Sequence, residues 1–142
     1  MVAIEGYIQG CAQVSISLFC LLKSNLFSQG GEVKSNFVSN YNAAKTAGFS
    51  RIDAYLFPCT GTQPTGVACK SPATQLSEFL AAIDNNGMDL GHLWLDIEPT
   101  STENGDACNA WNLGASANEA LAKEWVTALQ GSGRNWGIYA NG

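Results

Sequence analysis

The sequence predicts an α/β fold in which about four parallel strands are joined by crossover helices. This prediction rests on the alternation of two kinds of segment along the chain. Short apolar segments with a two-residue period alternate along the chain with longer segments of helical period, in the order strand, helix, strand, helix, strand, helix, strand. Four strands are too few to close an eight-stranded barrel, which typically takes about 250 residues. The 142 residues therefore form either a small open sheet or part of a barrel.

The first predicted strand and helix flank the least regular part of the chain. Residues 2–8 are apolar and predict a short buried strand, whereas residues 14–29 have neither period and no cap or turn signal. A helix is expected after Gly30, ending at Gly48 in a left-handed cap. Its apolar stripe would consist of Val33, Phe37, Val38, Tyr41 and Ala44.

The second predicted strand spans residues 51–57 and is followed by two cysteines and a helix. Alternation places Ile52, Ala54 and Leu56 on one face and Asp53, Tyr55 and Phe57 on the other. Cys59 and Cys69 enclose a turn-rich loop that a disulfide could staple. Ser71 and Pro72 then start a helix whose inner residues are Leu76, Phe79, Leu80 and Ile83.

The third predicted strand is the most informative part of the chain because it ends in two acidic residues. Alternation places His92, Trp94, Asp96 and Glu98 on one face and the apolar residues on the other. The Cα atoms of Asp96 and Glu98 would lie roughly 6 to 7 Å apart, so each charge would perturb the proton affinity of the other. One carboxyl could then stay protonated while its neighbour is ionised, with Trp94 as a low-dielectric wall. Active sites form at the carboxyl ends of parallel strands, so we expect a functional pair here.

The third helix and the last strand complete the predicted pattern. Ser116, with Glu119 three residues later, has the spacing of a capping box and predicts a helix that ends near Gly131. Its inner side would carry Leu121, Trp125, Ala128 and Leu129. Residues 136–140 predict the final strand.

Composition excludes several classes of function. The hydrophobic fraction of 46% is enough for the core of one globular domain. A formal net charge of -5, with seven scattered lysines and arginines, argues against nucleic-acid binding. The longest apolar tract is too short for a membrane span.

The five cysteines favour an oxidising compartment. No C-x-x-C motif is present, and the single histidine, His92, is far from any cysteine pair in the sequence, so we expect no metal site and no cofactor. The first residues lack a basic leader and include Glu5, so no signal peptide is visible.

Three segments of the chain together carry a family resemblance. They are Leu93-Trp94-Leu95-Asp96-Ile97-Glu98, the segment from Gly48 to Cys59, and Trp136-Gly137-Ile138-Tyr139. These segments resemble glycoside hydrolase family 25, the muramidases also called Chalaropsis-type lysozymes, in the form found in protists, fungi and nematodes. The resemblance implies a partial, irregular (β/α) TIM-like barrel. It also implies hydrolysis of the β-1,4 bond between N-acetylmuramic acid and N-acetylglucosamine in bacterial peptidoglycan.

The resemblance also implies roles for individual residues. Glu98 would be the general acid that protonates the leaving glycosidic oxygen, and Asp96 would stabilise the N-acetyl group or the oxocarbenium-like transition state. The substrate-binding residues would be Tyr55, Tyr139, Trp94 and Asp53. The full-length protein would be a secreted, phagosomal or lysosomal antibacterial monomer.

The chain departs from the family pattern at several places. It begins at what corresponds to the family's second strand, so an acidic residue of the first strand is missing, and it stops before the family's last strands. Gln9 stands where some relatives have glutamate. Residues 14–29 interrupt the usual strand-to-helix connection, and without them four cysteines remain. We hypothesise a translated intron or gene-model error there, the alternative being a true surface insertion. Cys59 and Cys69 form the favoured pair, which leaves Cys11 and Cys108 as partners.

Two further functions compete with this interpretation. One is a chitinase-like glycosidase with a D-x-x-D-x-D-x-E motif, although Trp94 stands where that motif requires an acid. The other is a catalytically inactive glycan-binding fragment, or a product that does not fold.

Overall fold

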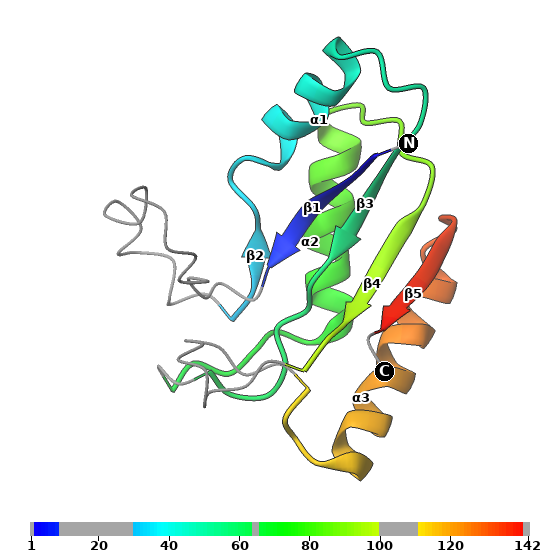
Figure 1. Cartoon of the computed structure of the whole chain (residues 1–142). Helices are drawn as coiled ribbons and strands as arrows, with labels where there is room; N and C mark the ends of the chain where they lie inside the picture. Colours follow the sequence, from blue (N-terminus) through cyan, green and yellow to red (C-terminus); the bar gives the residue numbers. More distant parts are fainter. Residues whose placement is uncertain (1, 9–29, 64–65, 100–110, 141–142) are drawn as a thin grey trace.

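A computed structural model describes residues 2–8, 30–63, 66–99 and 111–140, and in these ranges one sheet packs against three helices (Figure 1). The strands are β1 (Val2–Ile8), β2 (Glu32–Val33), β3 (Ile52–Leu56), β4 (Leu93–Ile97) and β5 (Trp136–Ala140). They are ordered β2-β1-β3-β4-β5. β1, β3, β4 and β5 are parallel, and β2 is antiparallel to β1. The predicted parallel α/β arrangement is confirmed, and β4 is an interior strand.

The helices are α1 (Phe37–Thr46), α2 (Pro72–Asn85) and α3 (Ala115–Gly131). The start of α2 follows the sequence signal, since the Ser71 side chain accepts a hydrogen bond from the backbone N–H of Thr74 and Pro72 occupies the first turn. Gly48 ends α1 with a φ of 82°, a conformation that glycine adopts without steric cost.

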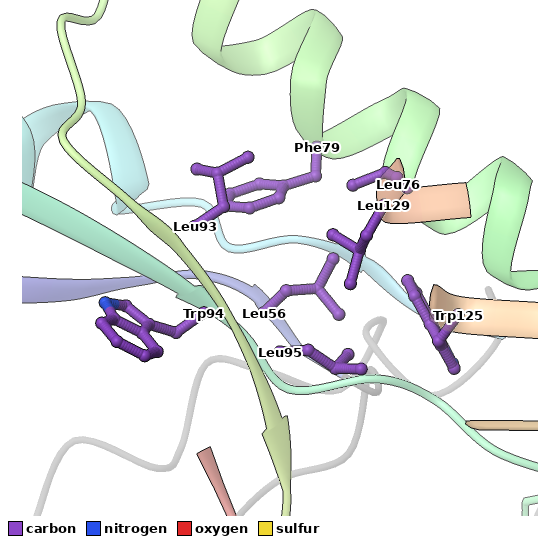
Figure 2. Close-up of a pocket in the computed structure, with 8 residues that line it drawn as sticks. All are labelled: Leu56, Leu76, Phe79, Leu93, Trp94, Leu95, Trp125 and Leu129. Atoms are coloured by element: carbon purple, nitrogen blue, oxygen red, sulfur yellow. The ribbon is translucent and has the colours of Figure 1, made fainter. Parts of the chain in front are cut away.

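All three helices pack on the same face of the sheet. Its parallel strands follow one another in chain order, so successive right-handed crossovers place their helices on one side. Leu56, Leu93 and Leu95 point to this side and meet residues of α2 and α3 around a cavity of only about 10 Å³, too small for a ligand (Figure 2). Phe37 of α1 contacts Phe79 of α2, with ring centroids 5.3 Å apart. The opposite face of the sheet therefore carries the polar residues of the strands.

The expected helical position of Val33 is wrong. Val33 lies in β2, where it pairs with Tyr7 of β1, and the N–H of Lys34 donates to the carbonyl oxygen of Gly6. Backbone pairing with the edge of β1 thus outweighs the helical spacing of Val33 and Phe37, and α1 begins only at Phe37.

The predicted capping box at Ser116 is also wrong. Gly114 is the N-cap residue of α3, no side chain caps the helix, and Glu119 pairs with Lys123 instead. The side chain of Asn118 turns back to the preceding loop, where it donates to the carbonyl oxygen of Trp111 at 2.6 Å.

Several expectations concern residues that the structure does not describe. The proposed insertion at 14–29 lies outside the described residues, as do Gln9, Cys11 and Cys108. The disulfide between Cys59 and Cys69 is confirmed. Within the described ranges, no helix has the length and hydropathy needed to cross a bilayer.

Candidate active site

The carboxyl ends of β3, β4 and β5 bring four side chains together on the sheet face opposite the helices. We call them the tyrosine–carboxylate cluster: Tyr55, Asp96, Glu98 and Tyr139. Asp96 and Tyr139 are directly paired in the register of β4 and β5. Alternation along β4 directs Leu93 and Leu95 into the core and leaves Asp96 on the other side, as the sequence predicts.

Asp96 is a partly buried acid with a raised pKa. Burial raises its pKa, and the negative charge of Glu98 raises it further, to about 6. Its Oδ1 atom is buried and has no hydrogen-bond partner among the described residues. The predicted electrostatic coupling of the two acids is therefore present. The family resemblance gives the acid role to Glu98, and the raised pKa of Asp96 does not by itself assign the roles of the two acids.

The same two carboxylates raise the pKa of both tyrosines. The pKa of Tyr55 is raised by burial and then by the charges of Asp96 and Glu98. The pKa of Tyr139 is raised by the charge of Glu98, by burial, by a hydrogen bond to the Glu98 side chain and by the charge of Asp96. Both hydroxyls therefore stay protonated at neutral pH and remain hydrogen-bond donors.

Asp53 lies on the same face as the cluster but is enclosed by donors. It is only 1% exposed. Its Oδ1 atom accepts from Arg51 Nε at 2.9 Å and from the N–H of His92 at 3.1 Å. Its Oδ2 atom accepts from Arg51 Nη2 at 3.1 Å and from Trp94 Nε1 at 3.2 Å. Both carboxylate oxygens thus accept hydrogen bonds from other residues of the chain, and Asp53 binds these residues in the structure.

Trp94 lies on β4 two residues before Asp96, with its ring on the side of the strand opposite Leu93 and Leu95 (Figure 2). The His92 ring stacks against the indole, with centroids 5.7 Å apart and an interplanar angle of 22°. On the β5 side, Gly137 is in register with Trp94, and a Cβ at Gly137 would lie 2.5 Å from Cζ3 of the indole. The indole therefore fits only because β5 has a glycine there.

Two supporting residues were not predicted as part of the site. Arg51 ion-pairs with Asp53, and its Nη2 lies 2.9 Å from Nδ1 of His92. The available signal was the spacing of Arg51 and Asp53, since residues two apart on a strand share a face. Among the described residues, no group of three or more His, Cys, Asp or Glu side chains could hold a metal ion.

Comparison of the sequence with known proteins identifies a family. The family model described as Lysozyme-like protein 1 matches residues 11–142. The chain belongs to this family. This lysozyme-like chain is 30% identical over 136 residues to Lysozyme-like protein 5 of Caenorhabditis elegans, covering 90% of the chain and 57% of that relative.

Of two relatives from Dictyostelium discoideum, one is named a lysozyme and the other a counting factor. Probable GH family 25 lysozyme 4 is 27% identical over 115 residues, covering 81% of the lysozyme-like chain and 46% of the relative. Counting factor 45-1 is 33% identical over 132 residues, covering 86% of the chain and 39% of the relative. The chain thus spans about half the length of these relatives or less. No solved structure matches it.

The resemblance to glycoside hydrolase family 25 is thereby confirmed at family level. Membership supports a function of the glycoside hydrolase type. The substrate and the roles of Asp96 and Glu98 remain predictions.

Proposed function

We propose that this chain is part of a family 25 catalytic domain that cleaves the β-1,4 bond between N-acetylmuramic acid and N-acetylglucosamine in peptidoglycan. The observation that carries the proposal is the position of Asp96 and Glu98. They lie together at the carboxyl end of an interior strand, between Tyr55 and Tyr139. Glycoside hydrolysis requires two carboxyl groups in different protonation states, and such a coupled pair supplies them.

In the proposed mechanism, Glu98 donates a proton to the leaving glycosidic oxygen while Asp96 stabilises the N-acetyl group or the oxocarbenium-like transition state. The Tyr139 hydroxyl donates a hydrogen bond to Glu98 and so orients the acid. Because the pKa of Asp96 is about 6, the pair retains a proton under mildly acidic conditions. In the free chain this proton is on Asp96, so the proposed mechanism requires that it pass to Glu98 when the substrate binds. We therefore expect a mildly acidic pH optimum. Trp94 is proposed to form the apolar floor beneath the sugar.

The sheet is proposed to be part of an irregular (β/α) TIM-like barrel. Consecutive parallel strands with all helices on one face are the repeating arrangement of such barrels, whereas a doubly wound sheet carries helices on both faces. The greater length of the relatives allows for the remaining strands. The Cys59–Cys69 disulfide supports an oxidising location, secreted or lysosomal.

The decisive experiment compares Glu98→Gln with Glu119→Gln on purified peptidoglycan. Glu119 is an exposed residue of α3 and serves as a matched control for the loss of one carboxylate. Loss of a general acid should lower the release of reducing ends by about 100-fold or more. The Glu119 variant should keep wild-type activity, and undiminished lysis by the Glu98 variant would remove Glu98 from the acid role.

A glycan-binding function without hydrolysis is the second candidate, because some relatives are named counting factors and not lysozymes. In that case muropeptides would raise the melting temperature of the chain without release of reducing ends. Cleavage of chitin but not of peptidoglycan would instead favour a chitinase-like substrate preference.

A further inference from the structure

We propose that Arg51 and Asp53 are positioning residues that lock the Trp94 indole in place as the floor of the sugar site. The surface of the indole would set how closely a bound pyranose ring approaches Asp96. This inference rests on the proposed function, and it adds a specificity device built from side chains that do not touch the reacting bond.

The first argument is the direction of the Trp94 N–H. The indole lies on β4, yet its Nε1 atom donates across to Oδ2 of Asp53 on β3. A buried carboxylate with no partner would be costly, and here four donors from three residues satisfy it. A hydrogen bond to a charged acceptor is stronger than one between neutral groups, so the indole is held firmly at this end.

The second argument is confinement of the indole on its other sides. His92 stacks on the ring, and Arg51 reaches His92 as well as Asp53, so one guanidinium ties both groups together. At the far end the six-membered ring lies close to Gly137 on β5. The indole therefore spans the polar face from β3 to β5 in a single orientation.

The third argument is what this orientation presents to a ligand. The only polar atom of the indole is directed to Asp53, so it is not available to sugar hydroxyls. His92 covers one face of the ring, and what remains of the partly buried Trp94 is an apolar surface in the layer next to Asp96. Such a surface suits the C–H face of a pyranose ring, which aromatic side chains bind through apolar contact. The substrate class is thus an N-acetylhexosamine ring placed with its apolar side toward Trp94.

The charge state of Asp53 agrees with its proposed role in positioning Trp94. Burial disfavours the charged form of Asp53, but the hydrogen bonds from Arg51 and Trp94, the charge of Arg51 and the bond from His92 outweigh it and lower the pKa. Asp53 therefore stays ionised in the mildly acidic range where Asp96 titrates. The hydrogen bonds to Asp53 would therefore persist over the pH range in which the chain is proposed to act.

The test is a double-mutant cycle on Asp53→Asn and Trp94→Phe, measured with soluble peptidoglycan fragments. Each single variant should raise KM about tenfold with kcat changed less than about twofold, since the floor contributes binding that is equal in the ground and transition states. The double variant should be no worse than either single variant, because both remove the same interaction. Asp84→Asn, which breaks a surface pair with Arg134, is the matched control and should keep the wild-type KM.

A second variant and a spectroscopic measurement separate positioning from folding. Gly137→Ala leaves Asp53 intact but places a methyl group against the indole, and it should raise KM in the same way. The near-ultraviolet circular dichroism of Trp94, obtained by subtracting the Trp94→Phe spectrum, should weaken in Asp53→Asn. An unchanged band, an unchanged KM in folded variants, or additive effects in the double variant would overturn the inference. A wild-type chain that neither binds nor cleaves the fragments would instead overturn the proposed function.

Discussion

The substitution Asp96→Asn should stabilise the folded chain at neutral pH while abolishing the proposed chemistry. Asp96 is buried enough, and close enough to Glu98, for its pKa to rise from 3.8 to about 6. Asparagine has nearly the same shape but carries no charge, so it avoids both the desolvation of a carboxylate and its repulsion by Glu98.

The magnitude and the sign follow from linkage between protonation and folding. A pKa that rises from 3.8 to about 6 corresponds to about 3 kcal/mol as an upper limit. Because Asp96 is partly exposed, solvent screening reduces this to about 1–2 kcal/mol. The folded state binds more protons than the unfolded state between about pH 4 and pH 6, so the free energy of unfolding falls as the pH rises through this range. The penalty is complete above about pH 6 and absent below about pH 4.

The assay is urea unfolding of wild type and Asp96→Asn at a series of pH values. The difference between the two free energies of unfolding should grow by about 1–2 kcal/mol from pH 4 to pH 7, in favour of the variant. Tyr55 and Tyr139, which face the pair, have raised pKa values and stay neutral over this range. Asp89→Asn at an exposed position controls for the loss of one charge. A difference that does not depend on pH would refute the reasoning, because a constant offset reports only packing.

Three further predictions concern the loop and helix that support β3. Replacing Cys59 and Cys69 with alanine should lower the free energy of unfolding by about 3 kcal/mol, since the disulfide closes a loop with a sequence separation of 10; an unchanged urea midpoint would contradict this. Gln75→Ala should cost about 2–4 kcal/mol in the same assay, because its buried amide bonds both the N–H and the carbonyl oxygen of Cys59. Ser71→Ala should cost about 1 kcal/mol through loss of the α2 cap, whereas Ser71→Asp should retain most of it.

The four parallel strands were predictable from the sequence because their patterns are local and strong, whereas β2 was not predicted. β1 has its expected bounds, β5 likewise, and β3 and β4 lie within the predicted segments. The start of α2 was equally predictable, since Ser71 and Pro72 act within one helical turn. The two-residue period placed Asp96 on the face opposite Leu93 and Leu95, whereas the prediction that Tyr55 joins it came from the family resemblance.

The errors arise where a distant partner overrides a local pattern. Val33 has helical spacing with Phe37, but the free edge of β1 offers it backbone hydrogen bonds. Ser116 has capping-box spacing with Glu119, but the N-cap of α3 is Gly114, two residues earlier, and the preceding loop is held through Asn118. Single-sequence patterns contain no information about these contacts.

The support around the site was unpredictable for a related reason. That Trp94 bonds Asp53 depends on the register between β3 and β4, in which Trp94 is paired with Tyr55, two residues beyond Asp53. Likewise, the raised pKa of Asp96 depends mainly on its burial, which the sequence does not give. Spacing predicts only that Asp96 and Glu98 interact.

The two aspartates on this face of the sheet show how environment separates structural from chemical roles. Asp53 receives four hydrogen bonds and its pKa is lowered, whereas Asp96 has a buried oxygen without a described partner and its pKa is raised to about 6. A group saturated by donors cannot exchange a proton near neutral pH or accept a new ligand without breaking those bonds. Asp96 retains both capacities. Of the two, Asp96 is therefore the aspartate that we propose meets the substrate, whereas Asp53 is proposed to act only through Trp94.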